Sequence, residues 1–531
     1  MKRVNRAFVN GNFVTMDRRQ PSARAIAVHG DRVVLVGDAP DAIAAAGSGA
    51  EVYDLRGLTV VPGFNDAHLH LTSFGLGLDD VELSGARSIG DITKAIHARA
   101  AAAAPGEWVV AHGYNHFRLV ERRHPTAVDL DMAAPANPVY LRHASGHLCV
   151  GNHMALRMAG IDRDTKDPEG GAIGRDPLTG APDGILYGAA QILLRRLRLP
   201  HPGNEIMRAL GLAGLEMARR GVTSCHEAQA GRLAPWEIET YRRAAEDGAL
   251  KVRVCLIRDG AVIPAGTREP EGDTSAGHML RLGPVKFFAD GSVSTGAAAF
   301  SQPYEGDGPR AAVRADELER MAGEVSSGNR VAVHAIGDAA IDASVETIQA
   351  AAAGRPAERH RIEHCGLPTR AAIETMRDLG MIAVLEPSFI RESGEWYVSL
   401  LGNDRANRMF PAGTLIRAGV HVAFGTDAPA SNATPLQAIH DAVHRSTEEG
   451  RVLGPDDRVS VIEALRCFTT GGAYASFEEN VKGRIATGML ADFAVLSDDI
   501  VRTSPSRLSA IKVVATVIGG EPVFVSGGLG W

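Results

Sequence analysis

The sequence predicts an α/β fold, and three patterns carry this prediction. Apolar runs of strand length alternate with helix-like stretches through the middle of the chain, as in GPVKFFADG (283–291), ADELERMAGEVSSG (315–328) and RVAVHAIGD (330–338). This pair repeats often enough to favour a (β/α)₈ barrel, although an open parallel sheet has the same periodicity. Both chain ends differ from the middle, because they consist of short apolar runs broken by turns.

The two chain ends predict one small β-sandwich domain built from both termini. FVNGNFVTMD (8–17) and AIAVHGDRVVLVGD (25–38) place Asn-Gly or His-Gly between strand-like runs, which is a hairpin signal. The same pattern returns in the last forty residues, in ADFAVLSDD and IKVVATVIGGEPVFVSG. We therefore predict a composite domain from residues 1–61 and 480–531.

The barrel is predicted over residues 62–479, with an interruption. Residues 74–220 fit the strand–helix rhythm poorly, since they include the Ala-rich ARAAAAAPG and the Gly-, Pro- and Asp-rich DPEGGAIGRDPLTGAPDG. We interpret residues 74–220 as an inserted subdomain over the mouth of the barrel.

Composition excludes several classes of partner. The 531 residues have a net charge of −7 without an acidic or basic block, which argues against a nucleic-acid surface and a basic membrane-binding face. No apolar run reaches the ~20 residues of a membrane span, and the N-terminal segment has no apolar core of a signal peptide. The cysteines are widely spaced and form no CxxC pair, which predicts a reducing, cytoplasmic location. They are Cys149, Cys225, Cys255, Cys365 and Cys467.

Polar side chains of metal-binding type follow the predicted strands. In a barrel of this kind the chemistry lies at the carboxyl ends of the strands. The run LTVVPGFNDAHLH ends in His68 and His70, which face the same way in an extended segment and can share one ion. Later runs each contribute one further candidate at or near their ends: Lys286, His334, His364 and Asp427.

Each of these residues alone has an ordinary explanation. A single histidine at a strand end is more often a hydrogen-bonded polar residue than a ligand, and Asp427 in GTDAP fits a turn. Together they predict a site for Zn²⁺ or a related divalent ion, which imidazole and carboxylate ligands suit. Lys286 lies among apolar residues, where an amine loses its proton more easily. A neutral amine can add CO₂, and the resulting carbamate would bridge two ions.

Five strand-end motifs resemble those of the amidohydrolase superfamily: PGFNDAHLH, VKFFADGS, VAVHAIGD, RIEHC and FGTDAP. The strongest resemblance is to amidohydrolase family 3, which includes N-substituted formamide deformylases. It extends over nearly the whole chain, through YLRHASGHLCVGNHMAL, GVTSCHEA, LEPSF and KGRIATGMLADFAVL. It implies a metal-dependent hydrolase with a barrel and a terminal β-domain, and a homodimer is a family expectation.

The resemblance also implies a ligand set for a binuclear metal centre. His68 and His70 would hold the first metal, with Asp427 completing it. His334 and His364 would hold the second, and a carbamylated Lys286 would bridge the two. Related enzymes hold one or two metals, so occupancy stays open.

The reaction expected from such a centre is hydrolysis of an amide-type C–N bond in a small molecule. A divalent ion makes hydroxide available near neutral pH, and Asp427 would take the proton and pass it to the leaving nitrogen. The same metal site would also serve a deaminase, or a hydrolase of cyclic amides, carbamates or esters. A catalytically inactive scaffold is the non-enzymatic alternative.

Candidates for contacts with substrate are Arg142, His147, His226, Glu386 and Tyr187. The first two lie in YLRHASGH, which resembles a family segment near the active site, and His226 lies at another strand end. Glu386 and Tyr187 depart from the family, which often has Gln and Glu at these positions, and we take them as signs of an altered substrate. A packed polar loop would also explain Arg142 and His147.

His143 in the same YLRHASGH segment is weighed in the same way as Arg142 and His147, whereas His112, His116, His124 and His153 of the predicted insertion receive no role. HGYNH (112–116) has a spacing typical of metal ligands on a helix, but its Gly-Tyr-Asn interior indicates a loop.

Overall fold

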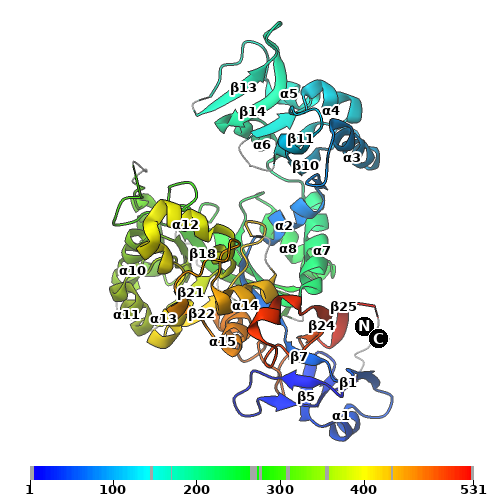
Figure 1. Cartoon of the computed structure of the whole chain (residues 1–531). Coiled ribbons are helices and arrows are strands. Elements are labelled where there is room, and N and C mark those ends of the chain that lie inside the picture. The colour runs from blue at the N-terminus through cyan, green and yellow to red at the C-terminus, as the bar shows by residue number, and fades with distance from the viewer. Residues whose placement is uncertain are drawn as a thin grey trace. The chain divides into compact units, whose positions relative to one another are not determined.

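The computed structural model describes residues 5–143, 148–168, 170–263, 272–273, 278–306, 311–352, 358–431, 434–527 and 531. The chain divides into two compact units (Figure 1). The larger unit comprises Met1–Phe74, Leu210–Arg232 and Trp236–Trp531, and the smaller comprises Gly75–Ala209 with Leu233–Pro235. The boundaries after Phe74 and Ala209 fall within two helices, α2 (Leu71–Leu78) and α7 (Gly203–Arg219).

In the part of the chain that the structure describes, eight parallel strands form the centre of the larger unit, in sequence order except for an antiparallel strand, β17 (Gly272–Asp273), that pairs with β18. The parallel strands are β8 (Phe64–Leu69), β15 (Val222–Ala230), β16 (Arg253–Asp259), β18 (Leu280–Phe288), β19 (Val331–Ala335), β20 (Arg361–His364), β21 (Ile382–Leu385) and β22 (His421–Phe424). Most are buried along their length, as parallel strands covered on both faces must be.

The last strand returns to the first, so that the sheet nearly closes. After β22 the Asp427 N–H donates to the His68 carbonyl of β8 at 2.8 Å, and the His70 N–H donates to the Ala428 carbonyl at 2.8 Å. These bonds confirm the predicted (β/α)₈ barrel over the open parallel sheet.

Helices lie between most successive strands and cover the outside of the barrel, as α10 (Asp338–Ala352), α11 (Arg370–Asp378) and α13 (Ala412–Ala418) show in Figure 1. In α11 the Thr369 hydroxyl caps the first turn, and Ala372, Ile373 and Met376 form the buried face. The other helices described in this unit include α1 (Ala39–Ala46), α8 (Glu237–Glu246), α9 (Ala315–Ser326), α12 (Ser388–Asn407), α14 (Pro435–His444), α15 (Val461–Arg466) and α16 (Gly472–Ala475).

Strands from both chain ends form two further sheets around one core. The first has the order β5 (Arg32–Gly37), β4 (Ala25–His29), β1 (Arg6–Val9), β6 (Glu51–Asp54). The second has the order β25 (Glu521–Val525), β24 (Val513–Ile518), β23 (Phe493–Leu496), β7 (Thr59–Pro62), β2 (Asn12–Val14), β3 (Ser22–Ala23). Phe8 of the first sheet packs edge-on against Phe493 of the second, with ring centroids 4.9 Å apart. The predicted β-sandwich from both termini is therefore present.

The smaller unit has its own sheet and core. Its sheet has the order β13 (Gly171–Arg175), β14 (Pro182–Gly188), β12 (Leu148–Gly151), β11 (Val139–His143), β10 (Val109–Tyr114), β9 (Val81–Glu82). Its helices include α3 (Ile89–Ala102), α4 (Ala127–Ala133), α5 (His153–Ala159) and α6 (Ile192–Arg195). Ile92 and Ile96 of α3 pack with Val139 and Leu141 of β11 in one buried cluster. No helix of the described chain is long and apolar enough to span a membrane.

Candidate metal centre

All six predicted ligands lie at the carboxyl end of the barrel. His68 is the second-last residue of β8 and His70 follows that strand, while His364 is the last residue of β20. Lys286 and His334 lie near the ends of β18 and β19, and Asp427 follows β22. Because parallel strands bring these ends to one edge, residues far apart in sequence meet there.

The four imidazoles form a row with Asp427 beside it. Ring centroids are 5.7 Å apart for His70 and His68, 4.7 Å for His68 and His364, and 4.5 Å for His364 and His334. Asp427 Oδ1 lies 3.4 Å from His70 Nε2 and 3.7 Å from His68 Nε2. One ligand atom each of His68, His364 and Asp427 lies within 4.8 Å of the other two. This tightest set takes ligands from both predicted metal positions.

Buried carboxyl groups form hydrogen bonds with the Nδ1 atoms of two of these imidazoles. Glu363 accepts the His68 Nδ1–H at 2.5 Å, and Glu386 Oε2 lies 2.8 Å from His364 Nδ1. Burial and the charges of Asp427 and Glu363 raise the pKa of Glu386 well above its usual value, and a cation at the site would favour the ionised form that accepts the Nδ1–H. A third carboxylate, Glu227, has its Oε1 3.7 Å from His70 Nδ1. A proton on Nδ1 leaves Nε2 with its lone pair, which is the form of histidine that binds a metal.

The backbone turns sharply at the site. His364 has φ of 67°, Cys365 has 43° and Asp427 has 55°, and these left-handed values are uncommon for residues other than glycine. Neighbouring residues of a regular strand point to opposite faces, yet Glu363 touches the His68 ring and the His364 ring lies against it too. The left-handed turn at His364 accounts for this arrangement.

Lys286 is almost completely buried, with 2% of its surface exposed, and its Nζ lies 5.3 Å from the centre of the Phe288 ring. Burial lowers the pKa of its amine, while the charges of Glu363 and Asp427 act in the opposite direction. The net downward shift favours the neutral amine, which is the form that reacts with CO₂.

The donor set fits a divalent cation. Among the described residues, Asp427 Oδ1, His334 Nε2 and Glu386 Oε1 are buried and have no hydrogen-bond partner. Buried acceptors without a donor cost free energy, and a cation among them would remove that cost. Burial also lowers the pKa of His334 well below its usual value and that of His364 to about 4, so these rings are neutral. Neutral imidazole and carboxylate ligands suit Zn²⁺.

Two of the predicted substrate contacts are buried beneath this cluster. Glu386 has no exposed surface and touches His364. His226 also has none, and its Nδ1 accepts a hydrogen bond from Arg361 Nη1 at 2.7 Å. Arg361 in turn pairs with Glu363 through two bonds of 2.7 and 3.0 Å. Both residues therefore lie in the hydrogen-bonded layer that supports the histidines.

The other predicted contacts belong to the smaller unit or lie outside the described residues. Arg142 forms an ion pair with Asp80 at 2.9 Å, and Tyr187 on β14 is 39% exposed. His147 lies outside the residues that the structure describes. A role for these side chains in substrate binding stays a prediction.

Sequence reasoning missed the supporting carboxylates Glu363 and Glu227. Both lie within buried strands, beside a residue that had already been singled out: Glu363 precedes His364, and Glu227 follows His226. A buried charged residue needs a partner, so a glutamate within an apolar strand indicates a buried polar contact.

Comparisons with known proteins identify the family to which this chain is similar. The model of the amidohydrolase family matches residues 51–524. A putative amidohydrolase, YtcJ of Bacillus subtilis, is 30% identical over 89% of this chain and 90% of its own length. N-substituted formamide deformylase of Arthrobacter pascens is 30% identical over 96% of this chain and 97% of its own. The crystal structure of an uncharacterized metal-dependent hydrolase from Pyrococcus furiosus has a TM-score of 0.78 and 25% identity, covering 94% of this chain and all of that one.

Proposed function

The chain belongs to the amidohydrolase family and is a metal-dependent hydrolase, and on this premise we propose that it cleaves an amide-type C–N bond of a small molecule. The observation that carries the proposal is the cluster of His68, His364 and Asp427, whose ligand atoms lie within 4.8 Å of one another in the barrel. The name of the similar Arthrobacter enzyme supports an N-substituted amide as the class of substrate.

We propose zinc as the metal, at one or two positions. His68, His70 and Asp427 would hold the first ion, and His334 and His364 the second. Lys286, as a carbamate, would bridge them; its burial and lowered pKa support this role. A divalent ion held there supplies Lewis acidity, which polarises a carbonyl and lowers the pKa of a bound water.

The residues of the chain then provide orientation and proton transfer. Asp427 Oδ1 is buried, has no donor among the described residues, and lies 3.4 Å from His70 Nε2. It is therefore placed to accept the proton of the attacking water and to deliver it to the leaving nitrogen. Glu363 and Glu386 keep His68 and His364 in the tautomer with a free Nε2. The proposal also includes a cytoplasmic location, expected from the cysteine pattern, and a homodimer, which is a family expectation.

A substrate panel tests the proposed reaction. Zinc-loaded protein is assayed with N-formyl and N-acyl amines for release of the amine, and with heterocyclic amines for release of ammonia. We expect turnover of the amides, lowered about 10²- to 10⁴-fold in kcat by Asp427→Asn. Ammonia release alone would identify a deaminase instead. A fully metal-loaded protein that turns over neither class would contradict both reactions and favour the scaffold.

A further inference from the structure

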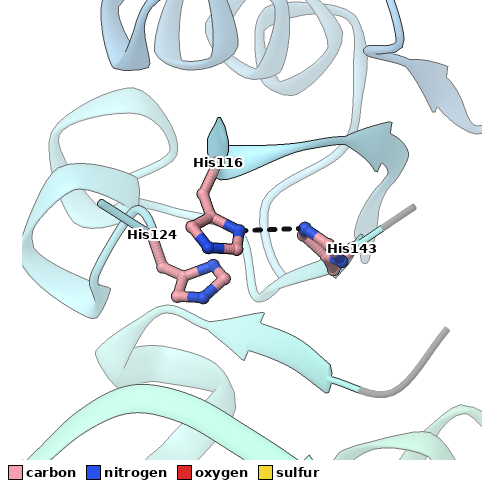
Figure 2. Close-up of side chains that lie close together, drawn as sticks. All are labelled: His116, His124 and His143. Carbon is pink, nitrogen blue, oxygen red and sulfur yellow. Dashed lines mark hydrogen bonds between the residues drawn. The ribbon is translucent and has the colours of Figure 1, made fainter. Parts of the chain in front are cut away.

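A second group of histidines gathers in the smaller unit, far from the barrel ligands in sequence. His116 begins a short 3₁₀ helix (His116–Arg118) just after β10, His143 is the last residue of β11, and His124 lies in the loop before α4. Figure 2 shows their rings side by side. They meet because β10 and β11 are parallel neighbours, with Tyr114 in register with His143.

The structure corrects the interpretation of HGYNH as a loop. His112, Gly113 and Tyr114 belong to β10, and the register against β11 shifts between His112 and Tyr114. Gly113 has φ of 89°, which a residue with a side chain rarely adopts, and this bulge turns the end of the strand. His112 and His116 therefore do not lie on one helix as a pair of ligands. His116 instead faces His124 and His143.

The three rings are as close as the ligands of one small ion. Ring centroids are 3.9 Å apart for His116 and His124, 5.2 Å for His116 and His143, and 5.5 Å for His124 and His143. One nitrogen of each ring lies within 4.8 Å of the others, and His116 Nδ1 is 3.2 Å from His143 Nε2. Zn–N bonds of about 2.0–2.1 Å in a tetrahedral site place ligand nitrogens about 3.3–3.4 Å apart, so the His116–His143 pair already has nearly the spacing of two ligands.

The surroundings resemble those of metal-binding histidines. His124 Nδ1 lies 3.0 Å from the Tyr114 hydroxyl, whose oxygen can accept the Nδ1–H and so leave Nε2 with its lone pair. Tyr114 is fully buried and packs into the core of the unit, which fixes its position. Burial, together with the neighbouring His116 and His143, lowers the pKa of His124 to about 4. The His124 ring is thus neutral near pH 7, as a ligand must be.

We propose that His116, His124 and His143 bind one divalent cation of the Zn²⁺ class. A set of imidazoles selects zinc, copper or nickel over magnesium and calcium, which prefer oxygen ligands. Three histidines leave a fourth position for water or a small ligand. The ion would join the end of β10, the loop before α4 and the end of β11. It shares no ligand with the barrel centre, and the proposal is independent of the reaction proposed there.

The test counts zinc in the full-length chain. Metal-stripped protein is titrated with Zn²⁺ in competition with a chromophoric chelator. We expect the double variant His116→Gln/His124→Gln to bind one zinc fewer per chain than wild type. The control variant His153→Gln changes a partly exposed histidine of the same unit whose ring pairs with Asp131, and it should bind zinc as wild type does.

Two further variants separate this site from the barrel and from misfolding. His364→Asn should lose zinc from the barrel and retain the zinc of the smaller unit. Tyr114→Phe removes only the hydroxyl beside His124, and should weaken one zinc site about 10- to 100-fold while circular dichroism stays unchanged. Equal zinc binding by wild type and a folded double variant would overturn the proposal. If the double variant does not fold, a Tyr114→Phe protein with unaltered zinc affinities would overturn it.

Discussion

Replacing Glu363 and Glu386 in turn by glutamine should have unequal effects on stability. Both carboxyl groups are fully buried, and each forms a hydrogen bond with Nδ1 of one histidine. They differ in one partner: Glu363 also neutralises Arg361, which has no exposed surface, whereas Glu386 Oε1 has no hydrogen-bond partner among the described residues. Glutamine retains the shape and one acceptor oxygen, so the comparison isolates the effect of the charge.

The expected magnitudes follow from these contacts. Glu363→Gln leaves the Arg361 guanidinium buried without its counter-charge, and breaking a buried pair in this way costs about 3–5 kcal/mol. Glu386→Gln leaves no buried cation without a partner, and burial and the charge of Asp427 already raise the pKa of Glu386 and disfavour its ionised form. This substitution should therefore cost at most one hydrogen bond, about 0.5–1.5 kcal/mol. Both variants should bind zinc in the barrel about 10- to 100-fold more weakly, because each loosens the orientation of a histidine ligand.

The two effects need separate assays. Urea unfolding of metal-stripped protein, followed by circular dichroism, measures stability without the contribution of the metal. Chelator competition on folded protein then measures zinc affinity. Equal losses of stability in the two variants, or a larger loss for Glu386→Gln, would refute the assignment of Glu363 as the counter-charge of Arg361.

Three other substitutions test the barrel. Lys286→Ala should lower the metal content of the barrel, measured by elemental analysis, and added formate should restore part of the lost activity; unchanged metal content would contradict a bridging role. Gly425→Ala places a Cβ 2.8 Å from backbone atoms of β8, so we expect about 1–3 kcal/mol of destabilisation and weaker zinc binding, whereas Gly323→Ala, with open space around it in α9, should be neutral or stabilising in the same unfolding assay. Arg253→Leu leaves the equally buried Asp492 without its partner at 2.6 Å and should cost about 3–5 kcal/mol by urea unfolding; a cost below 1 kcal/mol would show that this pair contributes little.

The barrel and its ligand candidates could be predicted because their signals are local. A parallel strand covered on both faces is a continuous apolar run, and a polar residue at its end stands out against that run, as His334 does in RVAVHAIGD. The order of the strands along the chain then implies that their ends meet. No long-range information is needed beyond the rule that places such ends at one edge.

The supporting carboxylates could not be predicted in the same way, because their partners are distant in sequence. Glu363 contacts His68, almost three hundred residues away, and alternation along a strand would place it on the face opposite His364. Only the left-handed backbone of His364 brings both side chains to one cluster. Glu386 was expected as a charge near substrate, but its contact with His364 depends on the pairing of neighbouring strands.

The histidines of the smaller unit show where the strand-end rule was applied too narrowly. Residues 74–220 lack a regular strand–helix rhythm, so the rule predicts metal ligands in the barrel alone and none at His116, His124 and His143. Yet β10 and β11 form a parallel pair with α4 between them in sequence, so their carboxyl ends meet just as those of β19 and β20 do. One parallel pair is enough to bring His116 and His143 together, and the intervening loop supplies His124. The strand-end rule therefore applies to polar residues that follow any two consecutive parallel strands, and not only to those of a complete barrel.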